Sequence, residues 1–289
     1  MDLSARIEQS LDKAVAYAQG PGAPPLLASA LRYAVFPGGH RIRPALCLSV
    51  AQACGDGDPD AADAAATAIE LLHCASLVHD DLPCFDDAPL RRGKPSVHCQ
   101  YGAPIAVLTG DALIVLAFET LAQRAARSPA RLTTLLSTVA QSVGSPHGIV
   151  AGQAWECEVA VSLTDYQRAK TGALFVAATA AGAAAAGADP GPWRTLGARL
   201  GEAYQVADDL RDVLCDAEEL GKPIGQDERR LRPNAAAQLG VGGAKNRLEG
   251  LVKAAVESIP ACPGALELRA LIKAQTALFF PKQLERAAA

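Results

Sequence analysis

The chain has 289 residues, a formal net charge of −4 and a sequence pI near 5.8, which together with the absence of a Lys/Arg-rich block argue against a nucleic-acid partner. Half of the residues are hydrophobic, only 4% are aromatic, and alanine is abundant, so we expect helices packed through small side chains rather than a sheet. No Ser/Gly linker divides the chain. We therefore predict a single all-α domain over residues 1–289.

The sequence also gives expectations about the cellular location of the protein. The first residues contain acids and lack an apolar core, so they do not form a signal peptide. The small-apolar stretch 173–188 is interrupted by Gly182 and Gly187 and is too short and alanine-rich for a bilayer, so no transmembrane segment is expected. Eight cysteines are scattered without zinc-ligand spacing, which indicates free thiols in a reducing cytoplasm.

Hydrophobic periodicity and breakers predict a succession of helices on short connections. They are expected at 3–18, 26–36, 44–53, 61–81, 105–127, 130–142, 147–160, 165–186 and 192–219, followed by two or three more. This pattern is typical of a helical bundle, in which ligand and metal sites lie in the core between facing helices. We therefore expect a central substrate cavity.

The fourth predicted helix ends in the run Asp80-Asp81-Leu82-Pro83-Cys84-Phe85-Asp86-Asp87. Six residues separate Asp80 from Asp86, and an unbroken helix would rotate them onto different faces. Pro83 disfavours helix at and before its own position, so we expect the helix to end near Asp80–Asp81. The following residues then loop, and Asp86 returns toward Asp80.

A second acidic run, Asp208-Asp209-Leu210-Arg211-Asp212, ends another apolar helix. Asp208 and Asp212 are four residues apart and share one helix face. Crowded carboxylates repel and are costly to desolvate unless a cation compensates them. All-oxygen sites suit Mg²⁺, which often shares its shell with phosphate, so a diphosphate substrate is indicated.

Basic residues lie where a diphosphate would need them. A glycine turn precedes two arginines at a predicted helix start in the segment 38–44, and such a start offers free N–H groups to phosphate. Arg91, Arg92 and Lys94 follow the first acidic run, and Lys222 follows the second. Lys170 and Thr171 lie between the two runs.

These elements, in this order, resemble the trans-prenyltransferases, the polyprenyl diphosphate synthase family. The similarity covers about residues 35 to 240. It comprises Gly38-Gly39-His40-Arg41-Ile42-Arg43-Pro44, the aspartates 80–86, Arg91-Arg92-Gly93, Gly152-Gln153, Lys170-Thr171, the aspartates 208–212 and Gly221-Lys222-Pro223.

The resemblance implies condensation of isopentenyl diphosphate with an allylic diphosphate, assisted by three Mg²⁺. The implied metal-binding residues are Asp80, Asp81, Asp86, Asp208, Asp209 and Asp212, of which Asp80, Asp86, Asp208 and Asp212 bridge the ions to the allylic diphosphate. Arg91, Lys170 and Lys222 would hold that diphosphate. Thr171 and Gln205 would shield the carbocation.

Isopentenyl diphosphate would be held by Arg43, Arg92 and His73, the last about two helical turns before Asp80. Two substrate-binding positions depart from the family pattern. His40 stands where the family usually has lysine, and a neutral imidazole is a weaker anchor. Arg232 begins an element that usually begins with lysine, and the two cations differ in geometry.

Product length would be set one turn or so before Asp80, where Ala75 and Ser76 are both small. An open floor at this level favours geranylgeranyl diphosphate (C20), most like bacterial enzymes serving carotenoid and bacteriochlorophyll synthesis. A farnesyl diphosphate (C15) synthase with a deeper floor, for example at Leu72, is the alternative. A non-catalytic regulatory partner subunit is a second alternative, and a terpene cyclase is disfavoured. A homodimer is implied, with 105–122 as its expected surface.

Overall fold

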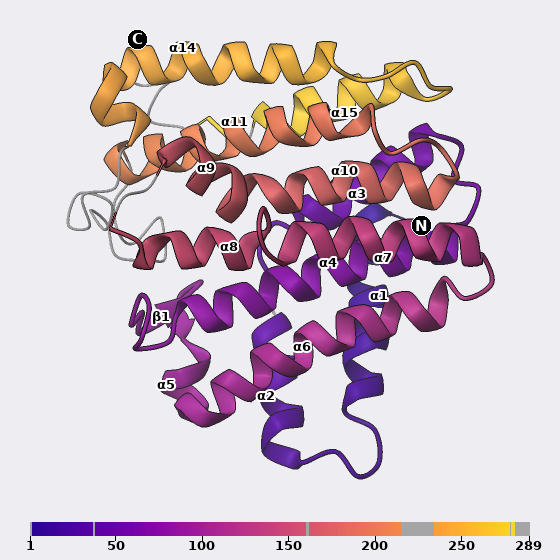
Figure 1. The fold of residues 1–289 in the computed structure, drawn as a ribbon, viewed down its shortest axis with the longest axis vertical. Helices are drawn as coiled ribbons and strands as arrows, with labels where there is room; N and C mark the ends of the chain where they lie inside the picture. The colour runs from indigo at the N-terminus through magenta and orange to yellow at the C-terminus, as the bar shows by residue number, and fades with distance from the viewer. Residues whose placement is uncertain (1, 37, 160–161, 215–233, 278, 281–289) are drawn as a thin grey trace.

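The computed structural model describes residues 2–36, 38–159, 162–214, 234–277 and 279–280. Its elements are almost all helical (Figure 1). They are α1 (Leu3–Ala18), α2 (Pro25–Val35), α3 (Ile42–Ala53), α4 (Pro59–Asp80), α5 (Val97–Tyr101), α6 (Ala103–Arg124), α7 (Pro129–Val143), α8 (Ile149–Ala154), α9 (Leu163–Gln167), α10 (Ala173–Ala186), α11 (Trp193–Leu214), α14 (Ala235–Glu257) and α15 (Ala265–Ala277). The predicted all-α class is confirmed.

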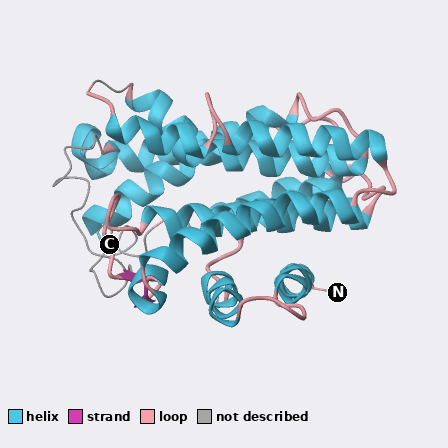
Figure 2. Ribbon diagram, turned by 60° about the horizontal axis from the view of Figure 1, so that its bottom comes forward, coloured by secondary structure: helices cyan, strands magenta, loops and turns pink. Residues whose placement is uncertain are grey.

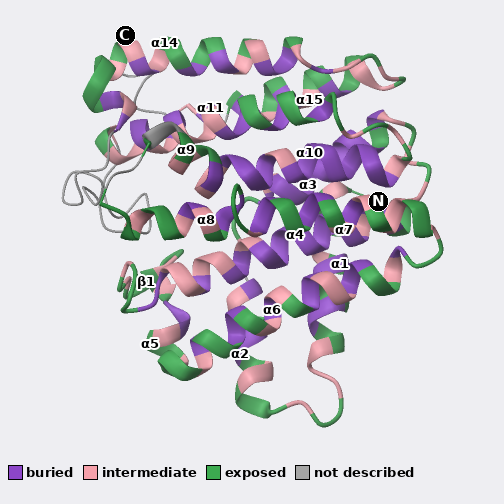
Figure 3. Ribbon diagram, in the orientation of Figure 1, coloured by how far each residue is buried: buried purple, intermediate pink, exposed green. Residues whose placement is uncertain are grey.

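The centre of the bundle is built from alanine-rich helices. α10 is buried along nearly its whole length and packs against α3, α4, α7 and α11 (Figure 3). Alanine lets helices approach closely without loss of side-chain rotamer freedom. α1 and α2 run across the long helices, and Figure 2 shows them nearly end-on beneath the rest of the bundle.

The ends of α4 follow from local sequence. Asp58 accepts a hydrogen bond from the Ala61 backbone N–H at 3.1 Å, and Pro59 occupies the first helical position. The helix ends at Asp80, three residues before Pro83, as predicted. The Asp86 N–H then donates to the Asp80 carbonyl at 2.9 Å, which confirms the predicted return of the loop.

Three local features differ from the predictions. The loop after α4 contains a two-stranded antiparallel ladder, β1 (Leu90–Arg91) with β2 (Lys94–Pro95), and a one-turn helix α5. The helix expected over 147–160 ends at Ala154 and continues as a short 3₁₀ turn, Trp155–Cys157. Between α9 and α10 the residues Arg168–Gly172 form a π-helical turn. None of these follows from hydrophobic periodicity alone.

The expected absence of a transmembrane segment stays a prediction, although the fold contains helices that are long and apolar enough to span a membrane by length and composition. Among the described residues, Pro59–Asp80, Ala103–Arg124 and the continuous helical run Asp165–Ala186 all meet that criterion. The apolar windows of the first and third are 78% buried inside the protein, so their apolar character is explained by the core. The window of Ala103–Arg124 is only 44% buried.

Two glycines allow α8 and α11 to lie unusually close to the backbone of the π-helical turn Arg168–Gly172. A side chain at Gly201 on α11 would lie 2.8 Å from the Gly172 Cα atom. A side chain at Gly152 on α8 would lie 2.4 Å from the Lys170 backbone nitrogen. Real Cβ atoms do not come so close, so these glycines fix how α8 and α11 lie against the π-helical turn.

Candidate active site

Both acidic runs face one cavity of about 800 Å³ at an end of the bundle. Asp80 and Asp86 line it from the end of α4 and the following loop, and Asp208 and Asp212 line it from α11. The predicted return of Asp86 toward Asp80 and the predicted common face of Asp208 and Asp212 agree with this placement, while the roles of the four carboxylates stay predictions. A cavity of this size is in the range of small-molecule sites.

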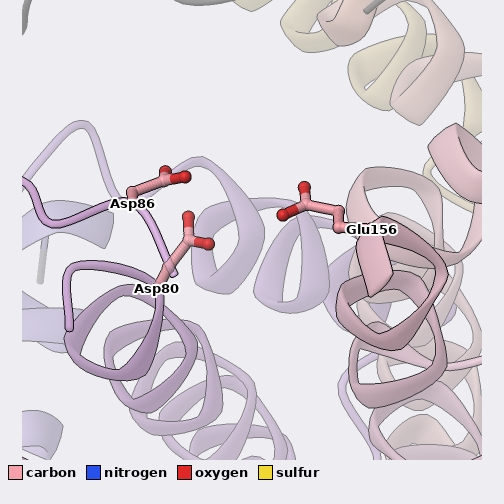
Figure 4. Close-up of side chains that lie close together, drawn as sticks. All are labelled: Asp80, Asp86 and Glu156. Carbon is pink, nitrogen blue, oxygen red and sulfur yellow. The ribbon is translucent and has the colours of Figure 1, made fainter. Parts of the chain in front are cut away.

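A third carboxylate joins the first acidic run. Oxygens of Asp80, Asp86 and Glu156 all lie within 4.8 Å of one another (Figure 4). Glu156 belongs to the 3₁₀ turn after α8, three residues beyond Gln153, and was not predicted as a site residue. The acidic pair Glu156 and Glu158 after Gly152-Gln153 was the sequence signal for this residue, but the contact with Asp80 depends on tertiary packing.

Lys170 lies between these carboxylates. Its Nζ donates to Glu156 at 2.5 Å and to Asp80 at 3.3 Å, and the Tyr166 hydroxyl donates to the same Glu156 oxygen at 2.6 Å. The π-helical turn inserts one extra residue into the helix at this point. It thereby presents both Lys170 and Thr171 to the cavity.

Burial raises the pKa of the Asp80 carboxyl above its ordinary value. The Lys170 ammonium opposes this shift, whereas the carboxylates of Asp86 and Glu156 add to it. Three oxygen donors of like charge in a desolvated cluster match the donor set of a hard divalent cation such as Mg²⁺. The residues present therefore fit the predicted metal.

Asp81 has a different position from Asp80. Its carboxylate is almost fully buried, does not line the cavity, and accepts a side-on pair of hydrogen bonds from Arg91. Burial raises the pKa of Asp81, and the Arg91 guanidinium opposes that shift. Arg91 itself lines the cavity, so Asp81 orients a predicted diphosphate-binding residue.

Asp209 also lies outside the cavity lining. Its side chain is 2% exposed and accepts hydrogen bonds from Gln205 and from the Ala235 N–H at the start of α14. Gln205 and Thr171 both line the cavity and are joined by a 2.9 Å hydrogen bond. The metal roles predicted for Asp81 and Asp209 remain predictions, and their positions point to orienting roles instead.

The predicted isopentenyl diphosphate residues form a second group. Arg43 lies over the rings of Phe175 and Tyr204, at 4.8 and 5.7 Å from their centroids, and is 3.4 Å from His73 Nε2. Burial and the facing arginines, Arg43 first and then Arg92, lower the pKa of His73 well below its ordinary value. His73 is therefore neutral, and Arg43 supplies the charge.

A buried ion pair fixes the start of α3. Arg41 donates to Glu70 at 2.7 Å, to Glu8 at 2.8 Å and to the Val35 carbonyl at 2.8 Å. Glu70 lies one turn before His73 on α4. The pair therefore holds α3 against α4, so that Arg43 and His73 can meet.

The remaining predicted residues divide into three sets. Arg92, Ala75 and Ser76 line the cavity. His40 is exposed and is not among the residues lining it. Lys222 and Arg232 lie outside the described residues.

Comparison with known proteins now adds to this geometry. Residues 24–262 match the model of the polyprenyl synthetase family. The chain belongs to that family. Geranylgeranyl diphosphate synthase from Cereibacter sphaeroides is 57% identical over 284 residues, which cover 98% of this chain and 99% of the relative. The synthase of the same name from Rhodobacter capsulatus is 52% identical over 288 residues, covering 99% and 100%.

Solved polyprenyl synthetases and related transferases share the fold. Geranyltransferase from Helicobacter pylori, solved in complex with magnesium and isoprenyl diphosphate, superposes with a TM-score of 0.78 at 29% identity. The match covers 94% of this chain and 96% of that protein. The isoprenoid-synthase type of helical bundle predicted from the motifs is thus confirmed.

Proposed function

We propose that this polyprenyl synthetase is a geranylgeranyl diphosphate synthase, which condenses isopentenyl diphosphate with C5 to C15 allylic diphosphates to give the C20 product. The observation that carries the proposal is the convergence of both acidic runs, Lys170 and Arg43 on one cavity. The names of the two bacterial relatives described above support the same activity. Synthesis for carotenoids or bacteriochlorophyll is the role that we infer for this product.

The two diphosphates would bind on different walls of the cavity. Mg²⁺, for which we propose three ions per site, supplies charge neutralisation to the allylic diphosphate as it departs. Asp80, Asp86, Asp208 and Asp212 would hold the metal. Arg91 and Lys170 would bind the allylic diphosphate, and the predictions for Lys222 add to this set.

Isopentenyl diphosphate would bind to Arg43, Arg92 and His73, which all line the cavity. A contact with His40 stays a prediction that the cavity lining does not support, and the predicted contact with Arg232 lies outside the described residues. Thr171 and Gln205 line the cavity and are joined by a hydrogen bond, and their oxygen atoms would face the positive carbon of the allylic chain. The isopentenyl double bond would attack this carbon and form the new C–C bond, which leaves a cation on the isopentenyl unit. That unit would then lose a proton to the departed diphosphate and re-form a double bond, so no protein base is required.

The hydrocarbon chain has an apolar wall available. Leu72, Ala75, Ile114, Val143 and Leu174 all line the same cavity as the aspartates. Ala75 lies five residues before Asp80 on α4, at the level where a large side chain would shorten the space. The small side chains at Ala75 and Ser76 support a C20 rather than a C15 product.

The test is product length by chromatography, with pure protein, Mg²⁺, isopentenyl diphosphate and each of the C5, C10 and C15 primers. A C20 product from these primers supports the proposal. A C15 stop would retain prenyl transfer and favour the farnesyl alternative, with a floor formed deeper in the cavity. Absence of turnover with every primer would favour the non-catalytic partner subunit.

Ala75→Phe sharpens this test. A phenyl ring in the wall should shift the main product from C20 toward C15, because it fills the space that the longer chain needs. Ala16→Phe places the same ring on an exposed position of α1 and should leave product length unchanged. Unchanged product length in Ala75→Phe would locate the floor elsewhere.

We also propose a homodimer formed through α6. Val107, Leu108 and Val115 are 41%, 51% and 64% exposed on this helix, whose apolar window is the least buried of the three described above. A second copy of the chain would cover them. Sedimentation at micromolar concentration should give a dimer, and Val115→Glu should weaken it; a monomeric wild type would contradict the proposal.

Two further proposals concern the whole chain. We propose that residues 1–289 form one polyprenyl synthetase domain, as the family match over 24–262 supports. We propose a cytoplasmic location. Seven cysteines in the described part of the chain are free, and burial raises the pKa of Cys47 and Cys74 to about 12, which suits inert thiols in a reducing compartment.

A further inference from the structure

Asp209 belongs to the second acidic run but faces away from the cavity. Its neighbours Asp208 and Asp212 line the cavity, whereas the Asp209 side chain is 2% exposed inside the protein. It lies one helical turn after Gln205, so the two side chains share a face of α11. The Gln205 Nε2 donates to Asp209 Oδ1 at 2.9 Å.

The chemistry of these groups fixes the direction of a hydrogen-bond chain. A carboxylate only accepts, so the amide NH₂ of Gln205 must face Asp209. The amide oxygen of Gln205 then faces Thr171, 2.9 Å from its hydroxyl. Since an amide oxygen also only accepts, Thr171 must donate its hydrogen to Gln205. Because its hydrogen is donated to Gln205, the Thr171 hydroxyl has no second hydrogen to present to the cavity that the residue lines.

The start of α14 holds Asp209 from the other side. The Ala235 N–H donates to Asp209 Oδ2 at 2.8 Å, and the Asn234 side chain donates to the Asp209 carbonyl at 3.4 Å. Asn234 also accepts from the N–H groups of Ala236 and Ala237 and so caps α14. The two N–H donors, from Gln205 on one carboxylate oxygen and from Ala235 on the other, compensate the burial of the carboxylate and fix its orientation.

We propose that Asp209 is a positioning residue, which orients Gln205 and Thr171 so that both present oxygen lone pairs, rather than N–H or O–H groups, to the reacting allylic carbon. The inference rests on the proposed function. In that reaction the allylic C–O bond breaks, its electron pair leaves with the diphosphate, and positive charge develops on carbon. The Asp209 carboxylate is the last acceptor in the series of hydrogen bonds from Thr171 through Gln205, and its charge polarises both hydrogen bonds toward itself. Reversal of Gln205 would direct N–H dipoles at the cation and raise the barrier.

The test compares Asp209→Asn with Asp208→Asn, the same change at adjacent residues. An asparagine at 209 can donate as well as accept, so it no longer fixes the Gln205 amide. We expect kcat to fall about 10- to 100-fold, since a hydrogen bond to a charged group is lost. KM for both diphosphates should stay within about two-fold of wild type, because no substrate contact changes.

A measurement of metal affinity distinguishes a positioning role of Asp209 from a role as a metal ligand. Mn²⁺ affinity is measured by electron paramagnetic resonance on the metal-free protein with inorganic pyrophosphate. We expect Asp209→Asn to bind Mn²⁺ as the wild type does and Asp208→Asn to bind it weakly. Equal loss of Mn²⁺ affinity in both variants would overturn the inference and leave the proposed function intact. A wild type without prenyl transfer would instead overturn the proposed function on which the inference rests.

A double-mutant cycle tests whether Asp209 acts through Gln205. Asp209→Asn should lower kcat in the wild-type background but add little in Gln205→Leu, because the amide to be oriented is gone. Independent, additive losses would overturn the inference. Gln205→Leu leaves the contact between Asp209 and α14 intact, so it remains informative if Asp209→Asn does not fold. An unchanged kcat in Gln205→Leu would also overturn the inference.

Discussion

The two acidic runs reach one cavity by different local structures. At the first, α4 ends at Asp80 and the loop returns Asp86 to it. At the second, α11 continues to Leu214 and presents Asp208 and Asp212 four residues apart. In both runs the second aspartate turns inward, but its partner differs. Asp81 holds the cation Arg91, whereas Asp209 holds the neutral Gln205.

This difference predicts a division of roles between the inward aspartates. Arg91 lines the cavity as a positive group suited to diphosphate, so Asp81 should affect substrate binding. Gln205 is proposed to face the reacting allylic carbon, so Asp209 should affect the chemical step. The outward aspartates of the two runs should behave alike.

The largest effect is expected for the outward aspartates. Asp80→Asn and Asp208→Asn should each lower kcat roughly 10³-fold, because each would remove a proposed ligand of the Mg²⁺ that would neutralise the leaving group. Asp60→Asn, at the exposed opposite end of α4, is the matched control and should be silent. Steady-state kinetics measures all three. A strong loss in only one of the two runs would show that the clusters are not equivalent.

Asp81→Asn tests the first inward aspartate. The loss of its carboxylate loosens Arg91, so KM for the allylic diphosphate should rise about 10- to 100-fold. The value of kcat at saturation should change much less, in contrast to Asp209→Asn. Kinetics with the allylic substrate varied at fixed isopentenyl diphosphate measures this. An effect on kcat alone would remove the distinction between Asp81 and Asp209.

Glu156 gives the first run a third carboxylate that has no identified counterpart at the second within the described residues. Glu156→Gln should weaken Mn²⁺ binding about 10-fold, since it removes a charged donor and releases Lys170. Glu158→Gln, two residues further on and exposed, is the control. Calorimetric titration with Mn²⁺ measures both. Equal affinities for the two variants would remove Glu156 from the metal site.

The smallest effect concerns pH. α4 carries His73, whereas α11 contains no histidine. Because the folded pKa of His73 is lowered, only the unfolded chain takes up this proton as pH falls below about 6.5. Stability should therefore fall by up to about 1.4 kcal/mol per pH unit there. The free energy of unfolding, measured with urea between pH 7.5 and 5.5, should show this acid-induced loss of stability in the wild type but not in His73→Asn.

The control for that measurement is the exposed His147. His147→Asn should lose stability with falling pH as the wild type does. If His73→Asn and the wild type lose stability in parallel, His73 is not the group responsible.

Sequence alone located most of this architecture because its signals are local. Pro83 predicted the end of α4, and the four-residue spacing of Asp208 and Asp212 predicted their common face; both follow from chain geometry. Glu156 was not predicted, because its contact with Asp80 joins parts of the chain that only the packing of α8 brings together. Similarly, the sequence gives two adjacent aspartates in each run but not which one turns inward.

The roles of Asp81 and Asp209 show the limit of motif reasoning. Adjacent residues on a helix point about 100° apart, so two neighbouring carboxylates cannot both face one ion equally well. Which of them is buried depends on partners outside the acidic runs, Arg91 on β1 and Ala235 at the start of α14. Those partners are not encoded in the spacing of the aspartates.

The close backbone contacts at Gly152 and Gly201 suggest that some positions of this protein can tolerate substitution during evolution and others cannot. Both glycines touch backbone atoms of the turn that presents Lys170 and Thr171, so a side chain there would displace the reacting groups for every substrate. Ala75 is a core residue that borders the part of the cavity proposed for the hydrocarbon chain. Related enzymes can therefore diverge in product length through wall residues such as Ala75, while the glycine contacts leave almost no room for variation.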